Sequence, residues 1–268
     1  MIILIRKSET FIVRTKISGQ NQSKKTGEQK GVWPLEQIQL IGNNIAKLPP
    51  HDIVESQPFS DLYPAGPDIF SYPTEVLWQI FADSNGKSWR QILDSLYTRY
   101  GWVYEHSVNV ALISVMIAVE LNMDRNSLYS LTLGGLLHDV GKLLIPMTII
   151  QKNTSLSEAE MNLIKKHSEL GMSLVAGCGL NSDSMAVIMQ HHERLDGSGY
   201  PYGLKSDEIH PLAKITMIAD VLDAITSYRP YRPARSIGEA ISLIKQEGDK
   251  FSREYVAVME KLHRKFSR

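Results

Sequence analysis

The sequence of 268 residues has almost no cysteine, because Cys178 is its only one. A lone thiol excludes a disulfide framework and a thiolate cage, so any bound metal ion would need nitrogen and oxygen ligands. The chain also lacks an excess of either charge, since 29 Lys and Arg residues balance 29 Asp and Glu residues. This balance argues against binding to an extended nucleic acid, which needs a basic surface.

Long apolar runs are lacking as well. Arg6 and Lys7 interrupt the apolar start of the chain, which is too short for a signal-peptide core or a membrane span. The longest later run, at 110–119, has about half the length that crosses a bilayer and is expected to be a buried core helix. We therefore expect no membrane span and a cytoplasmic protein.

Proline divides the chain into two parts, because seven of the 12 prolines lie in the first 73 residues. Two β-branched runs at 1–6 and 10–17 predict short strands, and a short helix is expected at 33–46. The polar stretch at 19–31 is expected to be a loop. Residues 1–70 are thus predicted to be a small mixed or irregular accessory segment of unknown role.

From residue 71 onward the apolar residues recur with a helical period, which predicts an all-α domain at 71–268. Serines placed shortly before acidic residues, such as Ser157 and Ser236, have the pattern of helix N-caps. The expected helices span 74–83, 88–100, 104–121, 127–137, 157–174, 182–191, 212–227, 236–248 and 252–266.

The histidines of the sequence are clustered along the chain. Five of its eight histidines fall between residues 106 and 192, and two carboxylates, Asp139 and Asp220, lie at or within apolar helical segments. Each residue alone fits a surface or structural position, but together they suit iron, manganese or a similar ion. Seven candidate ligands exceed the needs of one ion, so two ions are expected, with Asp139 bridging them. The five histidines are His106, His138, His167, His191 and His192.

Further polar residues stand beside these candidates. Helical spacing would bring Lys142 close to His138 and Asp139. The Asp-Gly-Ser-Gly-Tyr-Pro run at 196–201 could fold over a polar site or simply form a turn. Asp223 lies in an apolar helix, and an ion pair with one of the arginines that follow would satisfy its charge.

Three motifs together resemble the HD-GYP phosphodiesterases of the HD superfamily, which hydrolyse the bacterial second messenger cyclic di-GMP. They are HDVGK at 138–142, HHERLDGSGYP at 191–201 and ADVLDAITSYRPYR at 219–232. The resemblance covers about 100–260 and implies an HD-superfamily helical bundle. In family members with a third metal ion, a glutamate stands four residues before the first ligand histidine. Trp102 occupies that position here, so a site with two ions is expected.

The resemblance also implies roles for single residues. One ion would be held by His106, His138, Asp139 and Asp220. The other would be held by Asp139, His167, His191 and His192. Asp139 and Lys142 are the expected catalytic residues. The positions expected near substrate are Lys142, Tyr200, Asp223, Arg229 and Arg232.

The expected function is therefore a metal-dependent cyclic di-GMP phosphodiesterase in which a metal-bridging hydroxide attacks phosphorus. One alternative is a catalytically silent receptor or scaffold for a cyclic dinucleotide, and another is a phosphohydrolase of a different cyclic dinucleotide. Protein partners would dock through the loop that contains Gly199, Tyr200 and Pro201.

Overall fold

The computed structural model describes residues 2–7, 10–15, 71–227 and 234–266. At the N-terminus, β1 (Ile2–Lys7) and β2 (Thr10–Thr15) pair as an antiparallel hairpin, which agrees with the two short strands predicted there. The helix expected at 33–46 lies outside the described residues. The proposed domain boundary near residue 70 stays a prediction.

Everything described from residue 71 onward is helical or connects helices, so the predicted all-α class is confirmed. Three short 3-10 helices are η1 (Val140–Leu144), η2 (Ser206–Glu208) and η3 (Gly248–Lys250). The α-helices are α4 (Ser71–Ala82), α5 (Ser88–Arg99), α6 (Gly101–Glu120), α7 (Arg125–Leu137), α8 (Met147–Ile150), α9 (Glu158–Lys165), α10 (His167–Val175), α11 (Ser182–Gln190), α12 (Pro211–Thr226), α13 (Ile237–Gln246) and α14 (Arg253–Phe266).

Side-chain caps explain where several of these helices begin. Ser157 and Glu160 form a reciprocal capping box at the start of α9, and Ser236 and Glu239 do the same for α13. Asp124 accepts hydrogen bonds from two backbone N–H groups at the start of α7. Each cap satisfies donors that the first helical turn leaves unpaired, as the serine pattern in the sequence predicted.

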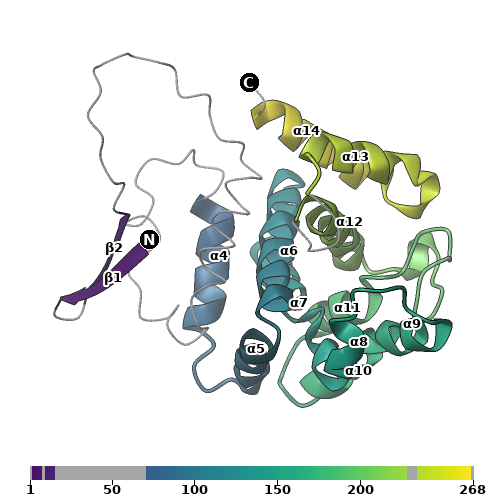
Figure 1. The fold of residues 1–268 in the computed structure, drawn as a ribbon. Helices are drawn as coiled ribbons and strands as arrows, with labels where there is room; N and C mark the ends of the chain where they lie inside the picture. Colours follow the sequence, from purple (N-terminus) through teal and green to yellow (C-terminus); the bar gives the residue numbers. More distant parts are fainter. Residues whose placement is uncertain (1, 8–9, 16–70, 228–233, 267–268) are drawn as a thin grey trace, which may run out of the picture.

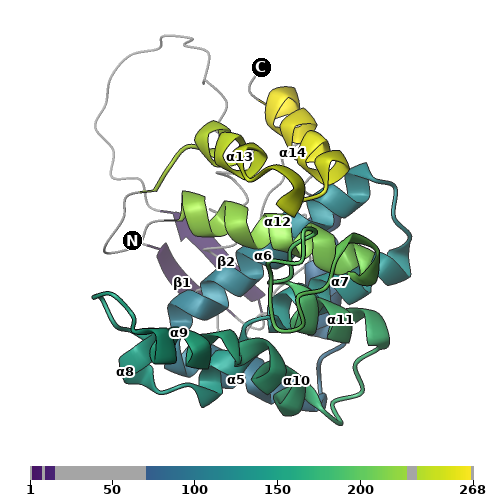
Figure 2. The ribbon, with the colours of Figure 1, turned by 90° about the vertical axis from the view of Figure 1, so that its right-hand side faces the viewer.

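Helix α6 runs through the middle of the helical domain, with α7 and α12 packed beside it (Figures 1 and 2). Its 20 residues are long and apolar enough to cross a membrane, but 83% of that apolar window is buried within the protein. The helix agrees with the one expected at 104–121 to within a few residues, and its role as a buried core helix is confirmed. It positions His106 in the interior of the domain.

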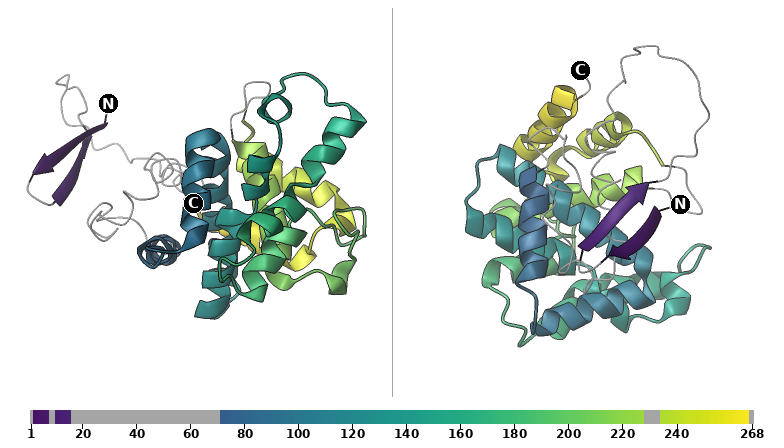
Figure 3. Two further views of the ribbon diagram at one scale, coloured as in Figure 1. Left: turned by 90° about the horizontal axis from the view of Figure 1, so that it is seen from below. Right: turned by 90° about the vertical axis from the view of Figure 1, so that its left-hand side faces the viewer.

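The other helices surround this centre. Figure 3 shows α4 and α5 in blue on one side of the domain, running in clearly different directions. In Figure 1, α13 and α14 lie at one end and α8, α9 and α10 at the other. The residues expected to bind metal lie within α6 and α12, at the start of α10 and just after α7 and α11. Figure 2 shows these helices in the helical domain.

Two local predictions were wrong. The single helix expected at 157–174 is broken at Lys166 into α9 and α10. The α-helical spacing expected to gather the HD motif does not apply, because α7 ends at Leu137 and η1 follows. A 3-10 turn aligns residues three apart, and it brings Lys142 onto Asp139 in place of an α-helix.

Candidate metal centre

Three of the five clustered histidines stand directly at the ends of helices. His138 follows α7, His191 follows α11, and His167 begins α10 two residues after the last residue of α9. In each case ring Nδ1 donates to the backbone carbonyl three residues earlier, in the last helical turn, where carbonyls lack an N–H partner. The acceptors are the carbonyls of Gly135, Ile164 and Ile188, at 2.7, 2.8 and 2.9 Å.

These three hydrogen bonds fix the hydrogen on one nitrogen of each ring. A carbonyl only accepts, so Nδ1 carries a hydrogen, and in the neutral ring Nε2 then has the lone pair. Three helix ends thus bring three ring nitrogens into the cluster around Asp139. A histidine that binds metal commonly donates its other ring nitrogen in this way.

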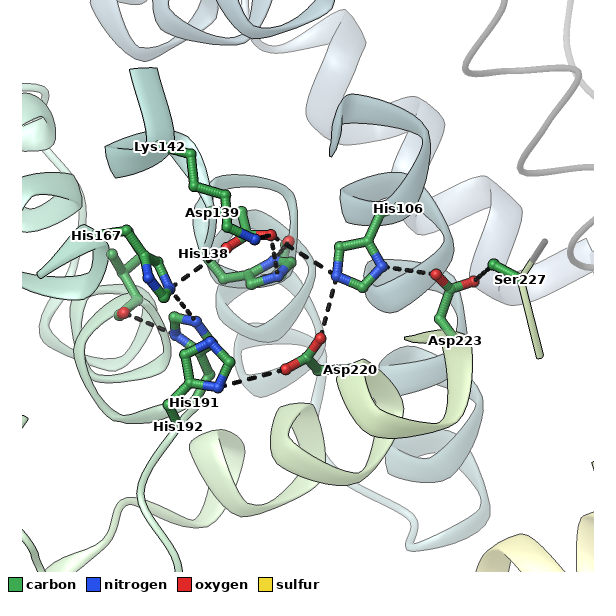
Figure 4. A network of polar contacts seen from close by, with 12 residues as sticks. His106, His138, Asp139, Lys142, His167, His191, His192, Asp220, Asp223 and Ser227 are labelled. Carbon is green, nitrogen blue, oxygen red and sulfur yellow. Dashed lines mark hydrogen bonds and ion pairs between the residues drawn. The ribbon is translucent and has the colours of Figure 1, made fainter. Parts of the chain in front are cut away.

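His106 reaches the same point from inside a helix, where the carbonyls are already used. Its Nδ1 donates to Asp223 Oδ2 at 2.6 Å, and its Nε2 lies 3.1 Å from Asp220 Oδ1 (Figure 4). The hydroxyl of Ser227 donates to the other oxygen of Asp223 at 3.0 Å. Asp223 is fully buried behind His106, and its expected contact with substrate stays a prediction.

Asp139 lies at the centre of the cluster and is 1% exposed. Its Oδ2 pairs with the Lys142 ammonium at 2.5 Å and lies 3.3 Å from His138 Nε2. Its Oδ1 is 3.4 Å from His167 Nε2. Burial raises the pKa of this carboxyl, but Lys142 and the surrounding histidines hold it well below its ordinary value. Asp139 is therefore an anion placed between two groups of imidazoles.

The pKa values of the histidines differ across the cluster. Burial lowers the pKa of His167 to about 4 and the pKa values of His191 and His192 well below the usual range. Burial also lowers the pKa of His106, but hydrogen bonds to Asp220 and Asp223 outweigh it and raise that pKa to about 9. The first three rings are neutral near pH 7 and can serve as ligands.

The cluster has unsatisfied atoms of the kind that a metal ion would satisfy. His138 Nε2 and Asp139 Oδ1 are buried and have no hydrogen-bond partner among the described residues. His167 Nε2 and His191 Nε2 lie 3.1 Å apart, although both must present lone pairs. A cation between such atoms removes the repulsion and the cost of burying them unpaired. The donor set fits metal ions.

The ligand atoms fall into two groups that share one carboxylate. The first group contains His106, His138 and Asp139, and its atoms lie within 4.8 Å of one another. The second group contains Asp139, His167, His191 and His192, within the same limit. Asp220 adjoins both, 3.1 Å from His106 Nε2 and 3.7 Å from His192 Nδ1. All seven residues predicted as ligands are brought together.

A close backbone contact holds the two groups in register. Helix α10 and η1 touch at Gly141, where an added Cβ would overlap the His167 carbonyl. Only glycine permits this approach, which explains the glycine of the HDVGK motif. The contact places His167 opposite Asp139.

Of the other residues expected near substrate, two lie beside the cluster and two lie outside the described residues. Tyr200 lies against His192, with ring centroids 4.7 Å apart and the ring planes 30° apart. Lys142 is near the cluster, 17% exposed, and bonded to Asp139. Arg229 and Arg232 lie outside the described residues.

Two buried contacts were missed by reasoning from the sequence. Ser227 supports Asp223, and Glu193 is fully buried and binds backbone N–H groups of the following loop. Glu193 could have been suspected, because an acid directly follows the two histidines of the motif. Nothing in the sequence separated Ser227 from an ordinary helix-end serine.

The region that holds this cluster matches a known protein family. The family model described as HD domain matches residues 90–254. The chain belongs to the HD domain family. The match contains all seven clustered ligand candidates, and the resemblance to HD-GYP proteins seen in the motifs is confirmed.

Two curated relatives are similar over this region. The cyclic di-GMP phosphodiesterase PA4108 of Pseudomonas aeruginosa is 37% identical over 147 residues, covering 54% of this chain and 36% of the relative. The 3'3'-cGAMP-specific phosphodiesterase 1 of Vibrio cholerae is 37% identical over 153 residues, covering 54% of this chain and 34% of the relative. The chain thus spans about a third of the length of these relatives.

A solved structure shares the fold. Bd1817, an HDG"Y"P protein from Bdellovibrio bacteriovorus, is 23% identical, with a TM-score of 0.56. The likeness covers 90% of this chain and 74% of that protein. At this identity the likeness supports the helical fold alone.

Proposed function

We propose that this chain is a metal-dependent phosphodiesterase that hydrolyses a cyclic dinucleotide, with cyclic di-GMP as the first candidate. The observation that carries the proposal is the pair of buried histidine–carboxylate groups that share Asp139. When bound, two metal ions would supply Lewis acidity, activating water and withdrawing charge from a phosphoryl group. Iron or manganese suits these nitrogen and oxygen donors.

The protein's own residues divide the work of holding such ions. His106, His138, Asp139 and Asp220 are proposed to bind one, and Asp139, His167, His191 and His192 to bind the other. Asp223 would keep His106 Nδ1 protonated and its ring in place, and a metal ion would displace the proton on Nε2 and bind there. A substrate contact by Asp223 stays a prediction beside this role.

Lys142 is the charged residue best placed for a phosphoryl oxygen. Its ammonium neutralises Asp139 at 2.5 Å and is partly exposed, so a small movement would bring it onto a phosphate anion. Breaking the phosphorus–oxygen bond leaves negative charge that a cation stabilises. The proposed clamp of the diester by Arg229 and Arg232 stays a prediction, as does a substrate contact by the Tyr200 hydroxyl.

The substrate is proposed from the relatives and not from the geometry. One relative is named for cyclic di-GMP and another for 3'3'-cGAMP, at the same identity of 37%. Hydrolysis of a mixed cyclic dinucleotide is therefore the second candidate function. The cytoplasmic location and protein partners at Gly199, Tyr200 and Pro201 stay predictions.

The test is hydrolysis by the purified chain, treated with chelator and then supplied with Fe²⁺ or Mn²⁺. A panel of cyclic di-GMP, 3'3'-cGAMP and cyclic di-AMP is incubated with it, and products are separated by chromatography. We expect turnover of cyclic di-GMP that is lost in Asp139→Ala. Binding without turnover of any dinucleotide would favour the receptor, and undiminished turnover by Asp139→Ala would refute the proposed mechanism.

A further inference from the structure

His192 differs from the other four clustered histidines in what holds its ring. The other four each donate Nδ1–H to a carbonyl or carboxylate. In the part of the chain that the structure describes, the nearest carboxylate oxygen to His192 Nδ1 belongs to Asp220, at 3.7 Å. That separation is too long for a hydrogen bond. Another contact must therefore orient this ring.

The ring of Tyr200 provides that contact. It stacks on His192 with centroids 4.7 Å apart and an angle of 30° between the planes. Offset stacking of this kind is favourable and limits rotation of the smaller ring. The backbone N–H of Tyr200 also donates to the carbonyl of His192 at 3.2 Å, which fixes the two residues relative to each other.

Glu193 fixes the loop that bears Tyr200. Its side chain is fully buried, and its two oxygens accept from the backbone N–H groups of Tyr202 at 2.8 Å and Leu204 at 2.9 Å. Hydrogen bonds to a carboxylate are stronger than those between neutral groups. They tie the far side of the loop to the residue that directly follows His192.

The loop also packs closely against the backbone that follows α11. A Cβ added to Gly199 would overlap the backbone of Glu193 and Arg194, so the loop lies directly on the end of α11. An isolated bridge between Asp196 and Lys205 closes its base. The position of Tyr200 over His192 is thus set by Glu193 on one side and by backbone contact on the other.

We propose that Glu193 is a positioning residue for the metal ligand His192. It acts by holding the loop that stacks Tyr200 on the His192 ring. This inference rests on the proposed function and extends it. It gives the HHE residues at 191–193 and the GYP residues at 199–201 one shared role, which is to orient His192 as a ligand of the second metal ion. Within the same loop, Tyr202 is 61% exposed.

The test begins with the full chain, from which bound metal has been removed with a chelator. This chain is titrated with Mn²⁺, and calorimetry measures the affinity for each ion. The wild-type chain should bind two ions. We expect Glu193→Gln, which keeps the shape but weakens the carboxylate's hold, and Tyr200→Ala, which removes the ring, to weaken one ion by about 10- to 100-fold. The affinity for the other ion should stay unchanged in both variants.

Two matched variants separate positioning from general damage. Tyr200→Phe keeps the stacked ring and should keep both affinities for Mn²⁺. Glu208→Gln alters an exposed carboxylate that accepts from the Lys205 N–H at 2.8 Å in the same region, and it should also keep them. A loss of fold would weaken both ions together, whereas a positioning role weakens one.

The outcomes distinguish this inference from the proposed function. If the wild-type chain binds two ions and both Glu193→Gln and Tyr200→Ala bind them equally well, the positioning role of Glu193 is wrong and the function stands. If Glu193→Gln does not fold, Tyr200→Ala against Tyr200→Phe decides, and equal losses in the two would refute stacking. A wild-type chain that binds no ion overturns both proposals.

Discussion

The two halves of the metal centre share Asp139 but are built from opposite chemistry. The first half places His106 between two carboxylates, Asp220 and Asp223, which raise its pKa to about 9. The second half consists of three imidazoles whose pKa values are lowered by burial. The first half is thus rich in negative charge and the second in neutral nitrogen.

Two ligand groups of unlike charge would therefore give the two proposed metal sites different properties. Carboxylate charge attracts any cation, whereas buried neutral imidazoles favour transition ions over Mg²⁺ or Ca²⁺. We therefore expect the first half to bind its ion more tightly and the second half to decide which metal is accepted. The substitutions below test the expected difference between the two ligand groups, beginning with the one that should have the largest effect.

Asp139→Ala removes the ligand that both halves share, so both should fail together. We expect loss of more than about 100-fold in affinity for each ion, and turnover below detection. Metal content per chain and product formation measure this. Asp207→Ala, which changes an exposed carboxylate in η2, is the control and should keep two ions. Retention of either ion by Asp139→Ala would show that Asp139 is not shared.

His167→Ala breaks the second half alone. Because His106, His138 and Asp220 are untouched, the metal content should fall from two ions to one, with turnover reduced at least about 100-fold. Elemental analysis after dialysis against a low metal concentration measures the content. Two ions retained by this variant would contradict the assignment of His167 to the second half.

Asp223→Asn tests the hydrogen bond that orients His106 in the first half. The amide keeps the volume but accepts more weakly from His106 Nδ1, so the affinity for the first ion should fall about 10- to 100-fold. The second ion should bind as before, and excess metal should restore turnover. Equal weakening of both ions would mean that Asp223 supports the fold rather than His106.

Ser227→Ala should have the smallest effect in this series. It removes one hydrogen bond to Asp223, worth about 1 kcal/mol, or about fivefold in the affinity for the first ion. Calorimetric titration beside Asp223→Asn measures the ratio. An effect as large as that of Asp223→Asn would mean that the hydroxyl, and not the carboxylate, orients the ring.

Much of the centre could be predicted from the sequence, because helix ends and motif spacing are local features. The histidines of the HDVGK and HHE motifs follow apolar helices directly, and their convergence was expected. The pairing of Lys142 with Asp139 was also expected, although a 3-10 turn produces it.

What could not be predicted depends on tertiary packing. Asp223 and His106 are 117 residues apart in the sequence, and arginines nearby along the chain were the more obvious partners for that carboxylate. The break at Lys166 was hidden because 157–174 has helical periodicity on both sides of it. The task of Glu193 depends on a loop that folds back over nine to eleven residues.

The central claim is that two ions, sharing Asp139, are both needed for hydrolysis. The most direct measurement loads the metal-free chain with successive equivalents of Mn²⁺ and follows bound metal and cyclic di-GMP turnover together. Turnover should stay near zero through the first equivalent and rise with the second, reaching its limit at two ions per chain. Full turnover with one ion bound, or turnover by the metal-free chain, would contradict it.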